Sequence, residues 1–303
     1  MNRLIKSSQI FLTGLFLTGC GHLNACRPEL EGTNREVPFR GAVYFHERVC
    51  SPVARSTHIL ELDLDDQDLR LEVTQGDSSA GMEYRAAVTS RYLEVAGWLA
   101  AVNGGYFEPF ASGSEGGEDY YPQAGDPVNV IGASIWRGQL VSREELTSDR
   151  RIDSIICIHG RDVWIENGQH CTGAVDYALS AGPRLLAGGT PLTIDIEDAG
   201  GKRLPRTAFG LDIRGRRAWF VVVDGRQPGF SRGISHRELT DLFRALGATD
   251  AITLDGGGSA TMVLSRMTGS QVVNSPIHTH IPGKERPVAN HLGVRGHRLD
   301  PVD

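Results

Sequence analysis

The chain has 303 residues, of which 40% are hydrophobic, and a formal net charge of -6. A chain of this length and composition can bury a sizeable core, which argues against intrinsic disorder and for one large domain or two small ones. The negative charge argues against non-specific binding to polyanions, so we expect no nucleic-acid partner.

The N-terminus has the layout of a signal peptide. Arg3 and Lys6 precede a short apolar run that ends in Leu17-Thr18-Gly19-Cys20. This run is shorter than the roughly 20 residues that span a bilayer. The segment resembles the lipobox of bacterial lipoproteins, so we expect residues 1–19 to be removed, Cys20 to carry a lipid, and the protein to be exported to the cell envelope and anchored in a membrane. An ordinary secretory signal with an incidental cysteine is the alternative.

The remaining cysteines are even in number, as expected in an oxidising compartment. They are Cys26, Cys50, Cys157 and Cys171. Three connectivities exist for four cysteines, and we favour Cys26 with Cys50 and Cys157 with Cys171 because each pair closes a short loop. No Cys-x-x-Cys pair is present, which argues against a zinc site.

The first third of the chain predicts a tether followed by two strands. Residues 20–54 are assigned to the lipidated N-terminus and tether, because residues 21 to about 40 are polar and contain proline. Alternating apolar residues at 58–64 and 69–73 predict two strands, joined by an acidic turn at 65–68.

Next, a helix is predicted over 84–96 and a strand over 98–102, which runs directly into Asn103. The stretch 108–127 is rich in glycine, serine, acidic residues and tyrosine and has no periodic pattern. Long loops of this kind are often functional. Its acids are oxygen ligands that calcium can use, but no spaced calcium-loop motif is present, and a solvated lid is the favoured interpretation.

The second half predicts a hairpin and then a helix. Residues 206–212 and 218–223 read as the two strands of the hairpin, and Asp224-Gly225 follows the second strand. Ser235 and Glu238 form a capping box, apolar residues at helical spacing follow, and Gly247 ends the helix. The chain then enters an apolar strand at 251–254.

That strand ends in Asp255-Gly256-Gly257-Gly258-Ser259, the most distinctive stretch of the sequence. A carboxylate at a strand end is held rigidly, and glycines let a ligand approach backbone N–H groups. This interpretation predicts a catalytic or anion-binding site. The alternative is that the glycines only permit a tight connection, with Asp255 capping a turn.

Six motifs, in order and at comparable spacing over residues 55 to 295, resemble those of the phosphodiester glycosidase family, which includes the mannose 6-phosphate uncovering enzyme. They are Asn103-Gly104-Gly105-Tyr106-Phe107, Ser180-Ala181-Gly182-Pro183, Arg206-Thr207-Ala208-Phe209-Gly210, Val223-Asp224-Gly225-Arg226, Leu254-Asp255-Gly256-Gly257-Gly258-Ser259 and Arg286-Pro287-Val288-Ala289-Asn290.

The resemblance implies an α+β fold, with a large mixed β-sheet and flanking helices over residues 55–298. It also implies a hydrolase that cleaves a sugar from a phosphodiester at the anomeric carbon. The leaving phosphate monoester has a second pKa of about 6, so strong general-acid help is less necessary than at an ordinary glycoside. Asp255 is then the candidate nucleophile or base for water, and Asp212 its candidate partner.

The other candidate residues are assigned to substrate binding. We expect Arg206 and Arg286 to clamp the phosphate, and Asn103 and Asn290 to hydrogen-bond the sugar or the anion. Structural ion pairs or turn capping are the competing roles for these four side chains. Asp224 is a further candidate, although it can also simply end a buried strand. The remaining candidates are Gly104, Gly256, Gly257, Gly258 and Ser259.

No cofactor is implied. The histidines His236, His278, His280 and His291 have no recognised metal spacing, and His278-Thr279-His280 is interpreted as an exposed loop pair. A phosphodiester-linked glycan or glycolipid is the expected substrate, and a membrane the expected partner of the lipid. Two other functions stay open, a non-catalytic lipoprotein that binds an anionic glycan and a phosphodiesterase that cuts the P–O bond.

Overall fold

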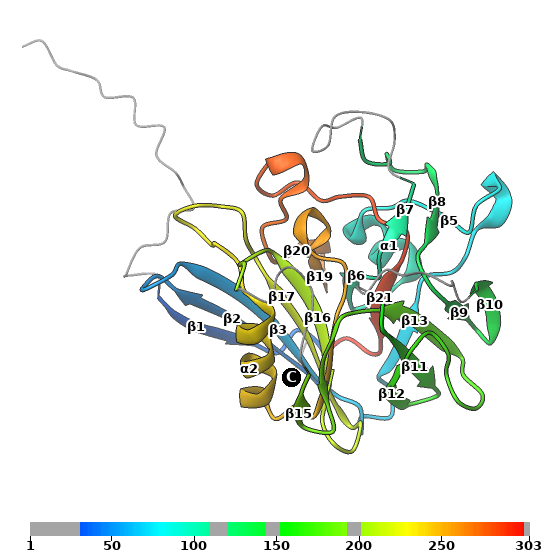
Figure 1. Cartoon of the computed structure of the whole chain (residues 1–303), viewed down its shortest axis with the longest axis horizontal. Helices are drawn as coiled ribbons and strands as arrows, with labels where there is room; N and C mark the ends of the chain where they lie inside the picture. Colours follow the sequence, from blue (N-terminus) through cyan, green and yellow to red (C-terminus); the bar gives the residue numbers. More distant parts are fainter. Residues whose placement is uncertain (1–30, 110–119, 144–151, 193–200, 300–303) are drawn as a thin grey trace, which may run out of the picture.

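An eight-stranded antiparallel sheet runs through the middle of the structure (Figure 1). The computed structural model describes residues 31–109, 120–143, 152–192 and 201–299. In spatial order the sheet contains β1 (Gly32–Glu36), β2 (Ala42–Val49), β3 (Arg55–Asp63), β17 (Arg217–Val223), β16 (Arg206–Leu211), β18 (Asp250–Thr253), β14 (Arg184–Ala187) and β15 (Thr190–Pro191).

Three smaller sheets pack beside it. The first contains β10 (Gln139–Ser142), β9 (Ser134–Trp136), β13 (Tyr177–Ala181), β11 (Ser154–His159) and β12 (Asp162–Asn167). The second contains β20 (Gly269–Val272), β19 (Met262–Arg266), β6 (Ala100–Asn103), β21 (His291–Arg295) and β4 (Arg70–Val73). The third contains β5 (Tyr84–Arg85), β8 (Pro127–Val130) and β7 (Phe107–Glu108).

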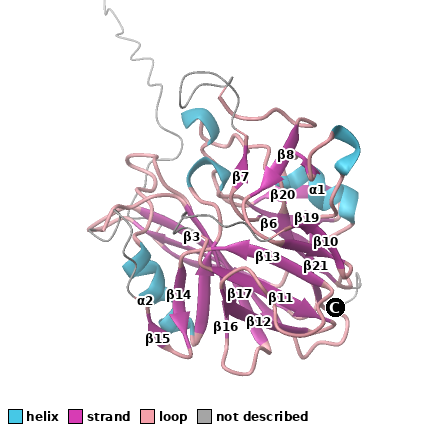
Figure 2. Cartoon of the chain, turned by 45° about the vertical axis from the view of Figure 1, so that its right-hand side comes forward, coloured by secondary structure: helices cyan, strands magenta, loops and turns pink. Residues whose placement is uncertain are grey.

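Two α-helices, α1 (Thr89–Ala96) and α2 (His236–Leu246), lie on the outside of the sheets in the part of the chain that the structure describes (Figure 2). On one face of the large sheet, Trp219 and Val221 pack against Leu239 and Phe243 of α2. On the other face, residues that include Phe220 form one buried cluster with residues of both five-stranded sheets. Because successive side chains of a strand point to opposite faces, β17 contributes to both cores.

The prediction of a large mixed sheet is wrong, because the sheets are antiparallel. All pairings between the named strands of the described residues are antiparallel. The strand–helix–strand pattern around α2 favours parallel neighbours. However, β17 and β18 both pair with β16, which lies between them. They therefore run in the same direction without touching as neighbours, and the fold is dominated by antiparallel sheets.

The second half follows the sequence closely. The predicted hairpin is confirmed as β16 and β17. The capping box of α2 is also confirmed, since the Ser235 side chain accepts a hydrogen bond from the Glu238 backbone N–H and Glu238 bonds back to Ser235. Gly247 ends the helix in the left-handed region, at a φ of 90°.

The first third differs more. The two strands predicted as neighbours around the acidic turn lie in different sheets, β3 beside β2 and β17 and β4 beside β21. The helix predicted over 84–96 begins only at Thr89, because Tyr84–Arg85 forms β5 and the Tyr84 ring is buried. Residues 32–49, which the sequence assigns to the tether, contribute β1 and β2 to the large sheet.

One predicted disulfide is confirmed between Cys157 and Cys171, whose Cα atoms are 6.0 Å apart. Cys50 is also disulfide-bonded, whereas its predicted partner Cys26 lies outside the described residues, as do the expected signal peptide at 1–19 and the lipidation site Cys20. None of the described helices is long and apolar enough to span a membrane.

Candidate active site

The family-like motifs converge at one end of the large sheet, although they are up to about 190 residues apart in the sequence. β16 begins at Arg206, which pairs with Val223, and Asp224 follows that residue directly. β18 ends one residue before Leu254, at the position where Thr253 pairs with Ala208 of β16. The turns after β18, drawn in orange in Figure 1, therefore lie beside the start of β16.

Asp255 is partly exposed at this end, two residues after the last residue of β18 and directly after the buried Leu254. Its backbone N–H donates to the Gly104 oxygen at 2.9 Å, and its backbone oxygen accepts from Asn103 Nδ2 at 2.6 Å. The carboxylate is oriented by Ser259, whose hydroxyl donates to Asp255 Oδ2 at 2.6 Å. Asp255 thus has the fixed backbone and open side that a catalytic carboxylate needs.

Arg286 lies on the other side of the same hydroxyl. Its Nη1 donates to Ser259 Oγ at 3.1 Å, and its Nε donates to Nδ1 of His278 at 3.2 Å. The guanidinium also stacks on the Tyr121 ring, 3.9 Å from the ring centroid. Burial lowers the pKa of Arg286, and the negative charge of Asp255 opposes this effect. Because a guanidinium stays charged even so, a carboxylate and a fixed cation are joined through one serine.

The glycine run allows this close approach. A Cβ built on Gly258 would lie 2.3 Å from Arg286 Nη2, and one on Gly256 would lie 2.8 Å from the Pro205 oxygen. Gly257 has a φ of +60°, in the left-handed region that favours glycine. The run is therefore needed for the packing of the turn against Arg286 and against the start of β16.

Asn103 and Asn290 are buried, with exposed fractions of 0% and 2%. Asn103 Oδ1 accepts from the Thr207 hydroxyl at 2.7 Å and from the Thr261 N–H at 3.1 Å. Asn290 Oδ1 accepts from the Gly105 N–H at 3.0 Å, and a Cβ on Gly104 would meet this same oxygen. Both amides therefore support the strand ends behind Asp255.

Asp224 lies at the same end of the sheet but is only 1% exposed. Its Oδ2 is 3.1 Å from His58 Nε2, and its Oδ1 accepts from Asn274 Nδ2 at 3.1 Å and from the Ser275 N–H at 2.7 Å. Although burial opposes ionisation, these hydrogen bonds and the His58 ring lower the pKa of Asp224. Asn274 also donates to the Ala260 oxygen. Asp224 therefore anchors the segment that follows the glycine turn.

The structure does not bring Asp212 to this site. Asp212 follows β16 at the hairpin turn, where its Oδ1 accepts from the N–H groups of Arg216 and Arg217 at 2.7 and 2.9 Å. In the sheet register Leu211 lies opposite Asp250, at the far end of β18 from Asp255. Asp212 is therefore separated from Asp255 by the length of a strand and stabilises the turn, so the two carboxylates do not form a catalytic pair.

Arg206, the second predicted clamp residue, does lie at the site end. It is 9% exposed, and its Cα would be 3.7 Å from a Cβ on Gly256. Its backbone is thus directly beside the glycine turn.

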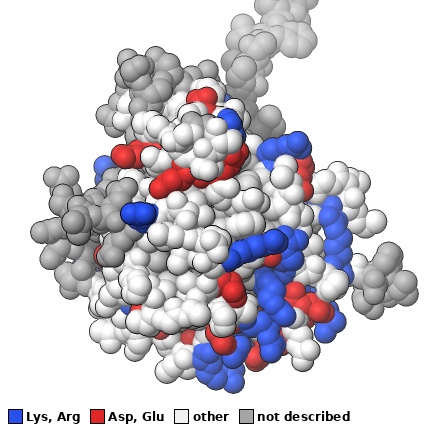
Figure 3. All heavy atoms as spheres, turned by 90° about the vertical axis from the view of Figure 1, so that its right-hand side faces the viewer, with Lys and Arg blue, Asp and Glu red and all other residues white. Residues whose placement is uncertain are grey.

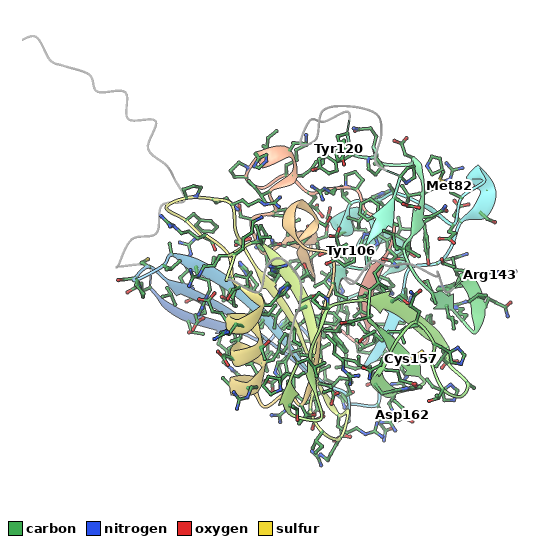
Figure 4. All side chains as sticks on the ribbon, in the orientation of Figure 1. Met82, Tyr106, Tyr120, Arg143, Cys157 and Asp162 are labelled. Atoms are coloured by element: carbon green, nitrogen blue, oxygen red, sulfur yellow. A yellow bond between two sulfur atoms is a disulfide. The ribbon has the colours of Figure 1, made fainter. Side chains whose placement is uncertain are left out.

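Sequence reasoning missed two residues that hold Arg286. Tyr121 comes from the 108–127 loop, of which residues 110–119 lie outside the described part, and its ring contacts both Arg286 and His278. Figure 4 labels the neighbouring Tyr120 beside this segment and Tyr106 nearer the middle of the molecule. His278 was expected in an exposed loop, but it is 3% exposed.

The feature that distinguishes the segment of His278 is its backbone conformation, which the sequence does not show. Thr279 and His280 have φ values of 50° and 61°, a conformation that residues other than glycine seldom adopt. No sequence pattern announces this conformation. Among the described residues, no group of three or more His, Cys, Asp or Glu side chains is placed to hold a metal ion.

The fold and the site define a class of protein that comparison with known families identifies. The family model for phosphodiester glycosidases matches residues 96–295, which is more than half of the chain, and the protein belongs to this family.

Solved structures of low sequence identity share the fold. The catalytic domain of zebrafish N-acetylglucosamine-1-phosphodiester alpha-N-acetylglucosaminidase, auto-inhibited by its pro-peptide, is 19% identical with a TM-score of 0.59, and the match covers 88% of each chain. A hypothetical protein from Synechocystis is 15% identical (TM-score 0.56, covering 89% of this chain and 65% of that one). A protein from Burkholderia pseudomallei K96243 is 16% identical (TM-score 0.60, covering 82% and 75%). Comparison with curated proteins finds no match.

Proposed function

We propose that this protein hydrolyses a phosphodiester-linked glycan, by cleaving the bond between the anomeric carbon of a sugar and the phosphate oxygen. Membership of the phosphodiester glycosidase family supports the reaction class. One observation carries the assignment to this site. A single hydroxyl, that of Ser259, donates to the Asp255 carboxylate and accepts from the Arg286 guanidinium.

This arrangement fits the charges of the reaction. As the anomeric C–O bond breaks, positive charge develops on the sugar and the electron pair leaves with the phosphate. Asp255 faces the sugar, as nucleophile at the anomeric carbon or as base for the attacking water. Arg286 stabilises the departing phosphate monoester. Because Ser259 links the two groups, the distance between them is fixed before substrate binds, which lowers the cost of orientation.

The supporting residues have defined roles in this mechanism. Asn103 holds the backbone of Asp255, and Asn290 holds the strand end at Gly104 and Gly105. Asp224 anchors the segment after the glycine turn through Asn274. These buried groups position the site without touching the substrate, so their loss should lower kcat through misplacement of Asp255.

Turnover of a sugar 1-phosphate diester in H₂¹⁸O tests the proposal. Cleavage at the anomeric carbon leaves the phosphate monoester product free of ¹⁸O, whereas P–O cleavage places ¹⁸O in a phosphate product, and mass spectrometry distinguishes the two. Asp255→Asn should abolish turnover with the fold retained, because amide and carboxylate are nearly equal in size. Full activity in this variant would remove Asp255 from the mechanism, and tight binding without turnover in the wild type would indicate a binding protein.

We also propose that the protein is exported and anchored in a membrane of the cell envelope by a lipid on Cys20. The support is the sequence Leu17-Thr18-Gly19-Cys20 after a short apolar run, together with the disulfide between Cys157 and Cys171, which is typical of oxidising compartments. The substrate would then be a phosphodiester glycan or glycolipid of the envelope. Cys20→Ser should release the protein from the membrane fraction, with Cys26→Ser as the matched control. Membrane retention of Cys20→Ser contradicts lipidation.

A further inference from the structure

A cavity with a volume of about 370 Å³ lies next to the glycine turn, because one of its lining residues, Arg226, lies against Gly257. It is open to solvent, and three arginines contribute to its lining. The lining residues are Arg203, Arg226, Gln227, Pro228 and Arg232. Such a concentration of guanidinium groups around a concave surface is the side-chain chemistry that recognises phosphate and carboxylate.

Gln227, one of the residues that line this arginine pocket, is held in place by hydrogen bonds. Gln227 is 6% exposed, and its amide is held on both sides, because Nε2 donates to the Ser275 oxygen at 2.8 Å and Oε1 accepts from the Ser275 hydroxyl at 2.9 Å. The segment folds back on itself, since the N–H groups of Gln227 and Ser231 each donate to the backbone oxygen of the other. A Cβ on Gly233 would lie 2.4 Å from the Leu204 backbone, so the segments that carry Arg232 and Arg203 are closely packed.

The charge of the pocket is unbalanced. Arg203 pairs with Glu238 at 2.7 Å, but within the described residues no ion pair is found for Arg226 or Arg232. Elsewhere on the surface arginines commonly have acidic partners, such as Arg295 with Glu72. Figure 3 shows one such face, where blue and red atoms are intermingled over the lower part. Among the described residues that line the pocket, positive charge is therefore in excess.

Arg226 connects the pocket to the candidate active site. Its Nη1 atom would be 3.3 Å from a Cβ on Gly257, so its guanidinium lies over the glycine turn that follows Asp255. Its charge also contributes to the lowered pKa of Arg286. Arg226 lies in the segment after β17 and has a φ of 55°, a backbone conformation that is uncommon for residues other than glycine. A ligand held at Arg286 can thus extend along Arg226 into the arginine pocket.

We propose that the arginine pocket binds a second phosphate group of the same substrate, so that the preferred substrate is a glycan with consecutive phosphodiesters or a terminal phosphate beyond the scissile one. This inference rests on the proposed function, because it takes the scissile phosphate to lie at Arg286. The second set of guanidinium groups, beyond Arg286 and open to solvent, matches the next anionic group of an extended chain.

Two matched substrates test this assignment, a sugar 1-phosphoglycerol diester and the same diester with a phosphate on the far hydroxyl of glycerol. Wild-type kcat/KM should be at least about tenfold higher for the doubly phosphorylated substrate, through KM, since each charge-assisted contact to phosphate is worth a factor of this order. Arg232→Gln and Arg226→Gln should each remove most of this preference. Arg244→Gln, which removes the same charge from the end of α2, should retain it. An equal kcat/KM for the two substrates, or a preference that survives Arg232→Gln and Arg226→Gln, overturns the proposal while leaving the glycosidase function intact.

Direct binding separates this inference from the catalytic one. If neither substrate is turned over, calorimetric titration with glycerol 1,3-bisphosphate and with glycerol 1-phosphate still tests the pocket. The bisphosphate should bind at least about tenfold more tightly, and Arg232→Gln should abolish the difference. Inorganic phosphate that competes as well as the bisphosphate would reveal a simple anion site and overturn the assignment to a second phosphate of the substrate.

Discussion

Substitution of Gly258 by alanine should damage the site while leaving the fold largely intact. The added methyl carbon would lie 2.3 Å from Arg286 Nη2, and ordinary contacts begin at 3.4 Å, so the guanidinium must retreat by about 1 Å. Hydrogen bonds to Ser259 and His278 and the stacking on Tyr121 resist this movement. A misplacement of about 1 Å at a catalytic group can cost about 100-fold in rate, or about 2.7 kcal/mol in activation free energy.

The assay is kcat/KM on a sugar phosphodiester, with thermal unfolding measured in parallel. Gly296→Ala is the matched control, because its methyl group would lie 2.7 Å from the flexible end of Leu69, at the end of β21 remote from Asn290. Both variants should lose on the order of 1 kcal/mol of stability from overpacking. Only Gly258→Ala should lose about 100-fold in kcat/KM. Unchanged kcat/KM in Gly258→Ala would refute the placement of Arg286 in the mechanism.

Three further predictions concern the clamp, the disulfide and the buried histidine. Arg286→Lys should lower kcat/KM at least about tenfold, because lysine lacks the planar fork, whereas Arg295→Lys on the surface should not; equal rates would contradict the clamp. Replacing Cys157 and Cys171 by alanine should lower the free energy of unfolding by about 3 kcal/mol without changing kcat, because the disulfide belongs to a separate buried cluster on the first five-stranded sheet; urea titration and kinetics check both. Burial lowers the pKa of His291 from 6.5 to about 3, so between these pH values the unfolded chain binds the additional proton and stability falls as the pH drops. His291→Gln should remove up to about 1.4 kcal/mol per pH unit from that slope in urea titrations, and an unchanged slope would contradict it.

Local patterns predicted the elements whose stability is local. The helix α2 could be read from Ser235, Glu238 and Gly247 because a capping box and a C-terminal glycine act within a few residues. The helix predicted over 84–96 includes Tyr84, but the buried hydroxyl of Tyr84 donates to Ser134 in another sheet. Tertiary packing of this kind overrides local propensity and has no signature in a short window. The same holds for the tether predicted over 20–54, of which residues 32–49 contribute β1 and β2 to one edge of the large sheet.

The surroundings of Arg286 could be predicted only in part, because they depend on contacts between residues far apart in the sequence. Its position in a family-like motif indicated a role in the site. Tyr121 and His278, which hold it, come from segments without periodic pattern, and their meeting depends on loop conformations that no spacing rule gives. The sequence predicts Ser259 only as a substrate-binding residue, whereas its hydroxyl links the Asp255 carboxylate to the Arg286 guanidinium. Such a bridge is a property of side-chain directions, which the sequence does not encode in any simple pattern.

The three aspartates at strand ends show where topology decides between equal sequence signals. Asp212 and Asp224 follow the two strands of one hairpin. Consecutive antiparallel strands run in opposite directions, so their last residues lie at opposite ends of the sheet. They therefore cannot share a site, and this conclusion was already contained in the predicted hairpin. Because β18 runs in the same direction as β17 on the other side of β16, Asp255 lies at the same end of the sheet as Asp224. Burial then separates the two, since Asp224 is enclosed by hydrogen-bond partners and Asp255 is partly exposed. Of the three carboxylates, only Asp255 both lies at the end of the sheet where the motifs meet and is partly exposed.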